Sequence, residues 1–117
     1  MLSFGGRALY LAVESIDMRY GVPRLSSWIE SRPDLRPQDG DLFIFLSKDC
    51  RRVKVMAWDV SGYWLCSKKL EGGRFARPVT TVGQSGRDTV TLSPAELGLL
   101  LEGISVHKAT YSRHRPD

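Results

Sequence analysis

Residues 42–69, LFIFLSKDCRRVKVMAWDVSGYWLCSKK, decide the fold of this chain. The first five, 42–46, are apolar at every position, which predicts a strand covered on both faces. Residues 52–58 alternate between small apolar and mostly longer side chains, as a strand with two different faces does. Residues 63–69 form a third strand that ends in charge, and short polar turns separate the three. This stretch therefore predicts an antiparallel meander.

Working outward toward the N-terminus, the apolar run at 8–13 predicts a further strand. A helix is predicted near 23–32, where Leu25, Trp28 and Ile29 follow the i, i+3, i+4 spacing of one helical face. Proline is compatible with the first turn of a helix, so Pro23 can open this one.

Working outward toward the C-terminus, residues 89–92 predict a short strand and residues 94–102 a second helix. Ser93 is placed to cap that helix, and Glu96 can reach back to the Ser93 N–H in a capping box. Gly103 suits the left-handed residue that ends a helix. We therefore expect a small α+β domain, an antiparallel meander of four to five strands packed with two helices. It should occupy residues 1–106, followed by a basic flexible tail at 107–117.

The positive charge of the chain is concentrated in its middle third. The net charge is +4 over 117 residues, and residues 41–80 alone hold eight basic and four acidic side chains, whereas the remainder balances. A local excess of cations can attract a polyanion, although it can also be a solubilising sheet face. Charge alone leaves both interpretations open.

The sequence carries no pattern for a metal or cofactor site. Cys50 and Cys66 lie far apart and far from both histidines, so no zinc spacing is present and no cofactor is expected. Glu14, Asp17 and Asp59 could in principle hold magnesium, but turn and capping roles are the simpler interpretation. No run approaches the length of a membrane span or of a signal peptide core, so we expect a cytoplasmic protein. The sequence shows no phosphate-binding loop and no signature of a nucleophile with its base, so we expect that the protein is not an enzyme.

The predicted hairpin mixes cations with aromatic rings. Basic residues at 51–54 lie close in sequence to Trp58 and Trp64. Cations neutralise phosphate and rings stack on bases, so such a surface suits nucleic acid. The alternative is that both tryptophans fill the core and only the basic rim is exposed.

Five segments of the chain carry the resemblance to a known family. In order, they are Asp17-Met18-Arg19-Tyr20-Gly21, residues 40–45, residues 54–62, residues 68–75 and residues 97–104. In the same order they are similar to the motifs Asp-Met-Arg-Lys-Gly, Gly-x-Leu-Phe-Val-Phe, Lys-x-x-x-Trp-Asp-x-x-Gly, Lys-Arg-Leu-Glu-x-Gly-Arg-Phe and Leu-x-x-Leu-Leu-Glu-Gly-Ile. These motifs are those of the Orf2-like (TnpB) accessory proteins of the bacterial insertion sequence 66 family, which the chain therefore resembles.

The resemblance implies a role in DNA transposition beside a transposase and a second small accessory protein of the same element. Two hypotheses follow from it. In the first, the chain binds DNA, through the candidate residues Arg19, Arg51, Arg52, Lys54, Lys68, Lys69 and Arg74. In the second, it is an adaptor that assembles the transposase without contacting DNA. Arg19 keeps two interpretations: a structural one, in which Asp17 caps the following turn and Arg19 makes a fixed ion pair, and a functional one, in which Arg19 contacts DNA or a partner protein.

Overall fold

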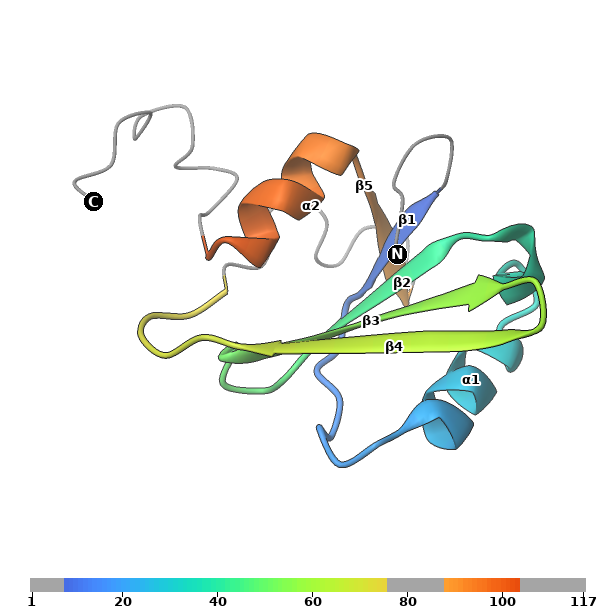
Figure 1. The fold of residues 1–117 in the computed structure, drawn as a ribbon, viewed down its shortest axis with the longest axis horizontal. Helices are drawn as coiled ribbons and strands as arrows, with labels where there is room; N and C mark the ends of the chain where they lie inside the picture. Colours follow the sequence, from blue (N-terminus) through green and yellow to red (C-terminus); the bar gives the residue numbers. More distant parts are fainter. Residues whose placement is uncertain (1–7, 76–87, 104–117) are drawn as a thin grey trace.

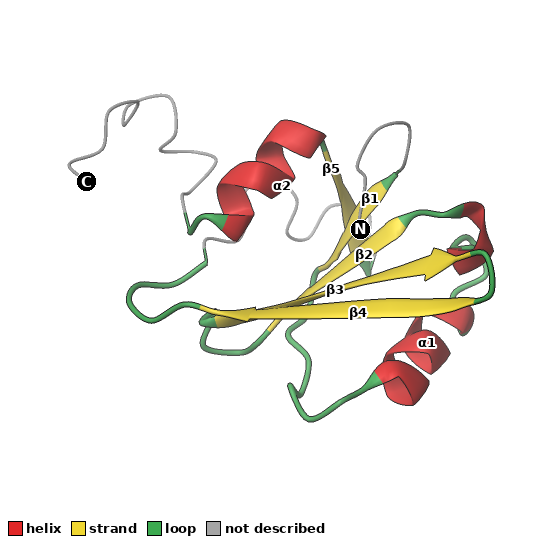
Figure 2. Ribbon diagram, in the orientation of Figure 1, coloured by secondary structure: helices red, strands yellow, loops and turns green. Residues whose placement is uncertain are grey.

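The computed structural model describes residues 8–75 and 88–103, and within them a five-stranded sheet lies between two helices (Figures 1 and 2). The elements, in chain order, are β1 (Leu9–Ala12), α1 (Val22–Glu30), the short 3-10 helix η1 (Pro37–Asp39), β2 (Leu42–Leu46), β3 (Arg52–Asp59), β4 (Gly62–Lys69), β5 (Thr89–Leu92) and α2 (Pro94–Leu101). The expected α+β fold and its two helices are confirmed. The predicted tail 107–117 lies outside the described residues.

The strands lie in the order β4-β3-β2-β1-β5. The meander of β2, β3 and β4 is antiparallel, as predicted, and β5 pairs antiparallel with β1. Only the pairing of β1 with β2 is parallel in this sheet. Parallel neighbours require a long crossover connection, and residues 13–41, which contain α1, provide it.

The central strand β2 is buried on both faces, which explains its unbroken apolar sequence. Its even-numbered residues Leu42, Ile44 and Leu46 belong to the cluster that packs against α2. Its odd-numbered residues Phe43 and Phe45 belong to the cluster that packs against α1. A strand covered on both sides needs no polar alternation.

Helix α1 packs through the face that its spacing predicts. Leu25 and Ile29 are fully buried, and the Trp28 ring meets Phe45 edge to face with centroids 5.4 Å apart. The guanidinium of Arg32 stacks on the outer side of Trp28, 3.5 Å from the ring centroid. The helix thus covers one face of the sheet with its own polar side turned outward.

Helix α2 begins and ends as its sequence predicts. The Ser93 hydroxyl accepts a hydrogen bond from the Glu96 N–H at 3.1 Å, and Glu96 accepts one from the Ser93 N–H at 2.8 Å, which completes the capping box. Gly103 has a positive φ of 80°, a conformation that glycine adopts without steric cost. Buried Leu97 and Leu100 anchor the helix on the opposite sheet face from α1.

No helix among the described residues is both long enough and apolar enough to span a bilayer.

Candidate nucleic-acid interface

A tightly hydrogen-bonded loop joins β2 to β3 and carries the main cationic candidates. The buried Ser47 accepts a hydrogen bond from the Cys50 N–H through its carbonyl, and its hydroxyl donates to Asp49 Oδ1 at 2.7 Å. The Arg51 N–H donates to the same carboxylate oxygen at 3.1 Å, and the Arg52 N–H donates to Ser47 Oγ at 3.1 Å. These contacts fix the backbone from which Arg51 and Arg52 project.

The charge of Asp49 is part of this loop structure. Hydrogen bonds from the Ser47 hydroxyl and the Arg51 N–H, in that order of importance, hold the pKa of the Asp49 carboxyl below its ordinary value. Cys50 adopts a positive φ of 58°, the left-handed conformation that lets the short loop close. The loop therefore keeps one geometry, with an ionised carboxylate turned toward its own backbone.

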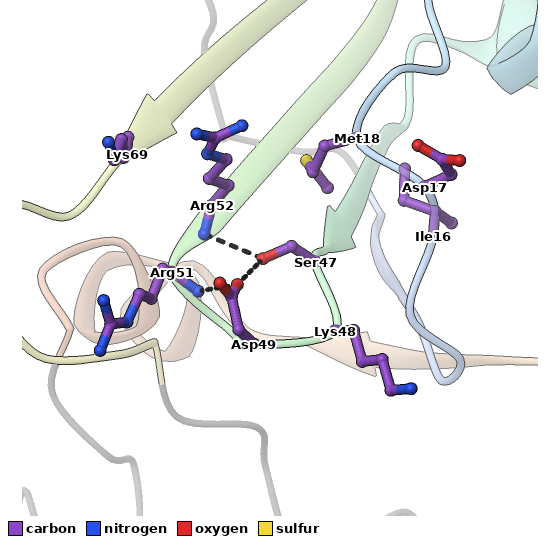
Figure 3. Close-up of a pocket in the computed structure, with 9 residues that line it drawn as sticks. All are labelled: Ile16, Asp17, Met18, Ser47, Lys48, Asp49, Arg51, Arg52 and Lys69. Carbon is purple, nitrogen blue, oxygen red and sulfur yellow. Dashed lines mark hydrogen bonds between the residues drawn. The ribbon is translucent and has the colours of Figure 1, made fainter.

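An open groove of about 820 Å³ runs between this loop and the segment that follows β1 (Figure 3). Its sides come from distant parts of the sequence, because the Ile16 N–H donates to the Leu46 carbonyl at 3.1 Å and draws that segment to the end of β2. The lining residues are Ile16, Asp17, Met18, Ser47, Lys48, Asp49, Arg51, Arg52 and Lys69. We call this surface the basic groove.

Two cations of the basic groove lie directly opposite each other on neighbouring strands. Arg52 opens β3, Lys69 ends β4, and the register pairs them across the sheet. Both are exposed, and like charges at such a position repel each other. In the part of the chain that the structure describes, no carboxylate forms an ion pair with Arg51, Arg52 or Lys69. With four cations and the two carboxylates Asp17 and Asp49 in its lining, the groove therefore presents an excess of positive charge.

Asp17 and Arg19 form a two-pronged ion pair at the side of this groove. The Arg19 Nη2–Asp17 Oδ2 distance is 2.6 Å and the Nε–Oδ1 distance is 3.0 Å. The Arg19 side chain lowers the pKa of the Asp17 carboxyl to about 2, with the Arg19 N–H contributing. The Arg19 side chain nevertheless stays 89 % exposed, so the ion pair expected of Arg19 forms with Asp17 and leaves the guanidinium accessible.

Two of the predicted cations are engaged with backbone carbonyls. Lys54 Nζ donates to the carbonyls of Met18 at 2.8 Å and Tyr20 at 2.7 Å. These two hydrogen bonds hold the segment beside the groove against β3. Lys68 Nζ donates to the Leu101 carbonyl at 2.9 Å, at the C-terminus of α2, on the other sheet face. Both side chains position elements of the fold.

Arg74 lies on the segment that follows β4. This segment is hydrogen-bonded to the loop between β2 and β3. The Leu70 N–H donates to the Arg51 carbonyl at 2.9 Å, and the Phe75 N–H donates to the Cys50 carbonyl. Phe75 is buried, whereas Arg74 is exposed. Of the predicted residues, the structure thus gathers Arg51, Arg52 and Lys69 in the groove and leaves Arg74 on an adjoining segment.

Sequence reasoning missed Lys48, Ile16 and Met18 as lining residues of the groove. Lys48 could have been included, because it lies in the same polar loop as Arg51. The two apolar residues gave no signal, because their position depends on the parallel pairing of β1 with β2.

The two tryptophans differ in their environments. Trp58 is half-buried and meets Tyr63 edge to face at 5.0 Å. Trp64 is 51 % exposed, and its Nε1–H donates to Asp59 at 2.9 Å. Cross-strand pairing places Trp64 on the α2 side of the sheet, away from Arg52 and Lys69, so neither ring lines the basic groove.

The carboxylates considered for magnesium do not converge. Asp17 lies at the groove, near the start of β3, whereas Asp59 ends β3 and binds the Trp64 indole. Across residues 8–75 and 88–103, no group of three or more His, Cys, Asp or Glu side chains is placed to hold a metal ion. Cys50 and Cys66 are both free thiols.

Comparison with known proteins gives the chain a family. Residues 7–111 match the family described as IS66 Orf2 like protein. Among similar curated proteins are two uncharacterized proteins of Sinorhizobium fredii. The chain is 35 % identical to y4hO over 96 residues, 82 % of this chain and 79 % of that protein. It is 33 % identical to y4jC over 99 residues, 85 % of this chain and 80 % of that protein. No solved structure matches.

The family match covers most of the chain, including β1 to β5, both helices and the basic groove. The chain therefore belongs to the IS66 Orf2-like family, the accessory proteins of an insertion sequence.

Proposed function

We propose that this protein assists an insertion-sequence transposase by binding DNA through the basic groove, without catalysing a reaction itself. The observation that carries the proposal is the pair Arg52–Lys69, two like charges held opposite each other beside Arg51 and Lys48. A bound phosphate would relieve their repulsion and gain two cationic partners. DNA is the polyanion that a transposition protein meets.

The form of the groove suits contacts to the phosphate backbone. The guanidinium group of an arginine can bind phosphate through two parallel hydrogen bonds, and the fixed loop holds two arginines at adjacent positions. Phosphate contacts set register and orientation, whereas sequence is recognised at base edges. Arg19 and Arg74 are both exposed, on segments that adjoin the groove, and Arg19 is paired with Asp17. Lys54 and Lys68 contribute by positioning, since their ammonium groups are engaged.

The transposase and the second small protein of the element are the expected partners. In this proposal the transposase cuts and joins DNA, while the groove holds DNA in place. The assembled complex would bring a non-catalytic DNA contact close to the active site of another protein.

The test is fluorescence anisotropy of a labelled duplex carrying the terminal repeat of the element, against a scrambled duplex, at about 50 and 200 mM salt. Salt-sensitive binding that favours the terminal repeat supports the proposal. Arg52→Ala and Lys69→Ala should each weaken binding several-fold and reduce the salt slope by about one. Arg36→Ala is the matched control, because Arg36 is exposed and precedes η1 at the other end of the sheet.

A different result would favour the adaptor function. If neither duplex binds at low salt, and a complex with the transposase forms despite Arg52→Ala and Lys69→Ala, the protein acts through protein contacts alone. Strand cleavage by the purified chain in magnesium would contradict the non-catalytic assignment.

A further inference from the structure

The outer edge of β4 carries backbone groups that no strand of the described chain pairs with. A two-residue turn joins β3 to β4 and makes Asp59 and Gly62 a hydrogen-bonded pair. From Gly62 onward, every second residue of β4 therefore exchanges backbone hydrogen bonds with β3, and the residues between them do not. The bond from the Leu70 N–H to the Arg51 carbonyl continues the same alternation. The N–H and C=O groups that point away from β3 are therefore those of Tyr63, Leu65, Ser67 and Lys69.

This edge lacks the features that usually prevent strand addition. Proteins protect edge strands with proline, bulges, short length or charge. Strand β4 has eight residues, pairs with β3 without a bulge, and carries no charge or proline from Gly62 to Ser67. Its charges are confined to Lys68 and Lys69 at one end. Such an edge accepts another strand only if that strand avoids placing cations against these two lysines.

We propose that a second copy of this chain pairs antiparallel with β4, with Cys66 opposite Cys66 of the other copy. In this register Tyr63 lies opposite Lys69, and Leu65 lies opposite Ser67. All four residues with outward backbone groups then find partners within the strand. A shift of two residues in either direction leaves one of the two end residues, Tyr63 or Lys69, opposite a residue beyond the strand, so this register pairs the edge completely.

The side chains of β4 are complementary to themselves in the same register. Lys68 lies opposite Trp64, and Lys69 lies opposite Tyr63, so no lysine faces a lysine. The Lys69 ammonium is attracted to the aromatic ring that it faces, and the stem of Lys68, whose ammonium is bound to the Leu101 carbonyl, can pack along the Trp64 ring. Trp64, 51 % exposed in the single chain, would gain this cover. Because the lysines of β4 lie at one end only, two antiparallel copies keep them apart. The charge pattern therefore favours a second copy of this chain as the occupant of the edge.

The axis of this dimer makes Cys66 a specific test. Cys66 is exposed, and it would meet its counterpart at a pair without hydrogen bonds, where Cα atoms lie about 4.5 Å apart. That separation lies within the range that disulfides span. Mild oxidation should produce a covalent dimer in the wild-type protein and in Cys50→Ser, but not in Cys66→Ser. A covalent dimer formed through Cys50 overturns the proposal.

The non-covalent test uses substitutions at the same position under reducing conditions and without DNA, so its result is independent of the DNA-binding proposal. Analytical ultracentrifugation should show a concentration-dependent dimer for wild type and for Cys66→Ser. Cys66→Lys places two ammonium groups opposite each other and should raise the dissociation constant at least several-fold. Mixing Cys66→Lys with Cys66→Glu should restore the dimer as a heterodimer.

Three results would overturn the proposal. The first is a monomer at every concentration up to several hundred micromolar, which would leave β4 unpaired or covered by another segment of the chain. The second is a dimer that Cys66→Lys leaves unchanged. The third is a failure of the Lys and Glu variants to associate when mixed, because only an axis at position 66 predicts that rescue.

Discussion

The ammonium group of Lys54 joins the sheet to the segment that follows β1. It donates to two carbonyls, those of Met18 and Tyr20, so one side chain fixes both the bend of this segment and one side of the basic groove. Lys54 is predictable from sequence as an exposed cation of a mixed strand face. Its engagement is not, because the two carbonyls lie more than 30 residues away and belong to a segment without regular structure.

Replacing Lys54 with methionine should keep the apolar stem and remove both hydrogen bonds. We expect the free energy of unfolding to fall by about 1.5–3 kcal/mol, the magnitude of a hydrogen bond to a charged group. Urea denaturation measures the change. Lys48→Met is the matched control, since Lys48 is an exposed loop residue and its loss should stay within about 0.5 kcal/mol. Equal stability of the two variants would contradict the role given to Lys54.

The ion pair between Asp17 and Arg19 should be visible in a titration. NMR should find the pKa of the Asp17 carboxyl at about 2, rising toward 3.8 in Arg19→Ala. Because the folded pKa is lowered, the stabilising contribution is complete above the unfolded value of about 3.9 and is lost as pH falls through about 2. Arg36→Ala should leave the titration of Asp17 unchanged. An Asp17 carboxyl that titrates normally in wild type would show that the pair does not form in solution.

At the scale of elements, the local signals in the sequence predict the structure well. The capping box at Ser93, the apolar spacing of Leu25 and Ile29, and the alternation of β3 each depend on residues a few positions apart, and each is present. The parallel pairing of β1 with β2 depends on a crossover of about thirty residues, which periodicity does not encode. For the same reason the sequence predicted the cations of the groove, but it did not predict that the segment of Ile16 and Met18 forms the opposite side.

The capping box of α2 gives a prediction at this scale. Ser93→Ala removes the acceptor for the Glu96 N–H and should lower the free energy of unfolding by about 1 kcal/mol. Thermal or urea unfolding followed by circular dichroism measures it. Ser27→Ala is the control, because Ser27 is exposed within α1, where alanine is the better helix former. A loss at Ser27 as large as at Ser93 would refute the capping contribution.

At the scale of the whole molecule, the protection of backbone amides from hydrogen exchange should decrease from the centre of the sheet to its edges. Strand β2 has a neighbour on each side and a helix over each face, whereas β4 has one neighbour and ends beyond the apolar clusters. In the single chain, local opening should therefore cost least along β4.

Hydrogen exchange measures this gradient directly. The slowest amides should be those of β2, at Phe43 to Phe45, and fast exchange is expected at the β4 amides that point away from β3, among them those of Leu65 and Ser67. In a dilute sample these two should exchange nearly as fast as amides in loops. Slow exchange at Leu65 and Ser67 in Cys66→Lys, at a dilution that keeps it monomeric, would show that another segment of the chain covers this edge.

The position of β1 also has a consequence for the order of folding. Among the five strands, β1 is synthesised before the others, yet it lies between β2 and β5, and its antiparallel partner β5 follows about eighty residues later. The meander β2-β3-β4 needs only short loops to close, so it can form while synthesis continues. Closure of the β1–β5 pair must wait for the C-terminal part of the chain. During that interval one side of β1 has no strand beside it, which leaves the nascent chain vulnerable to aggregation until β5 has been made.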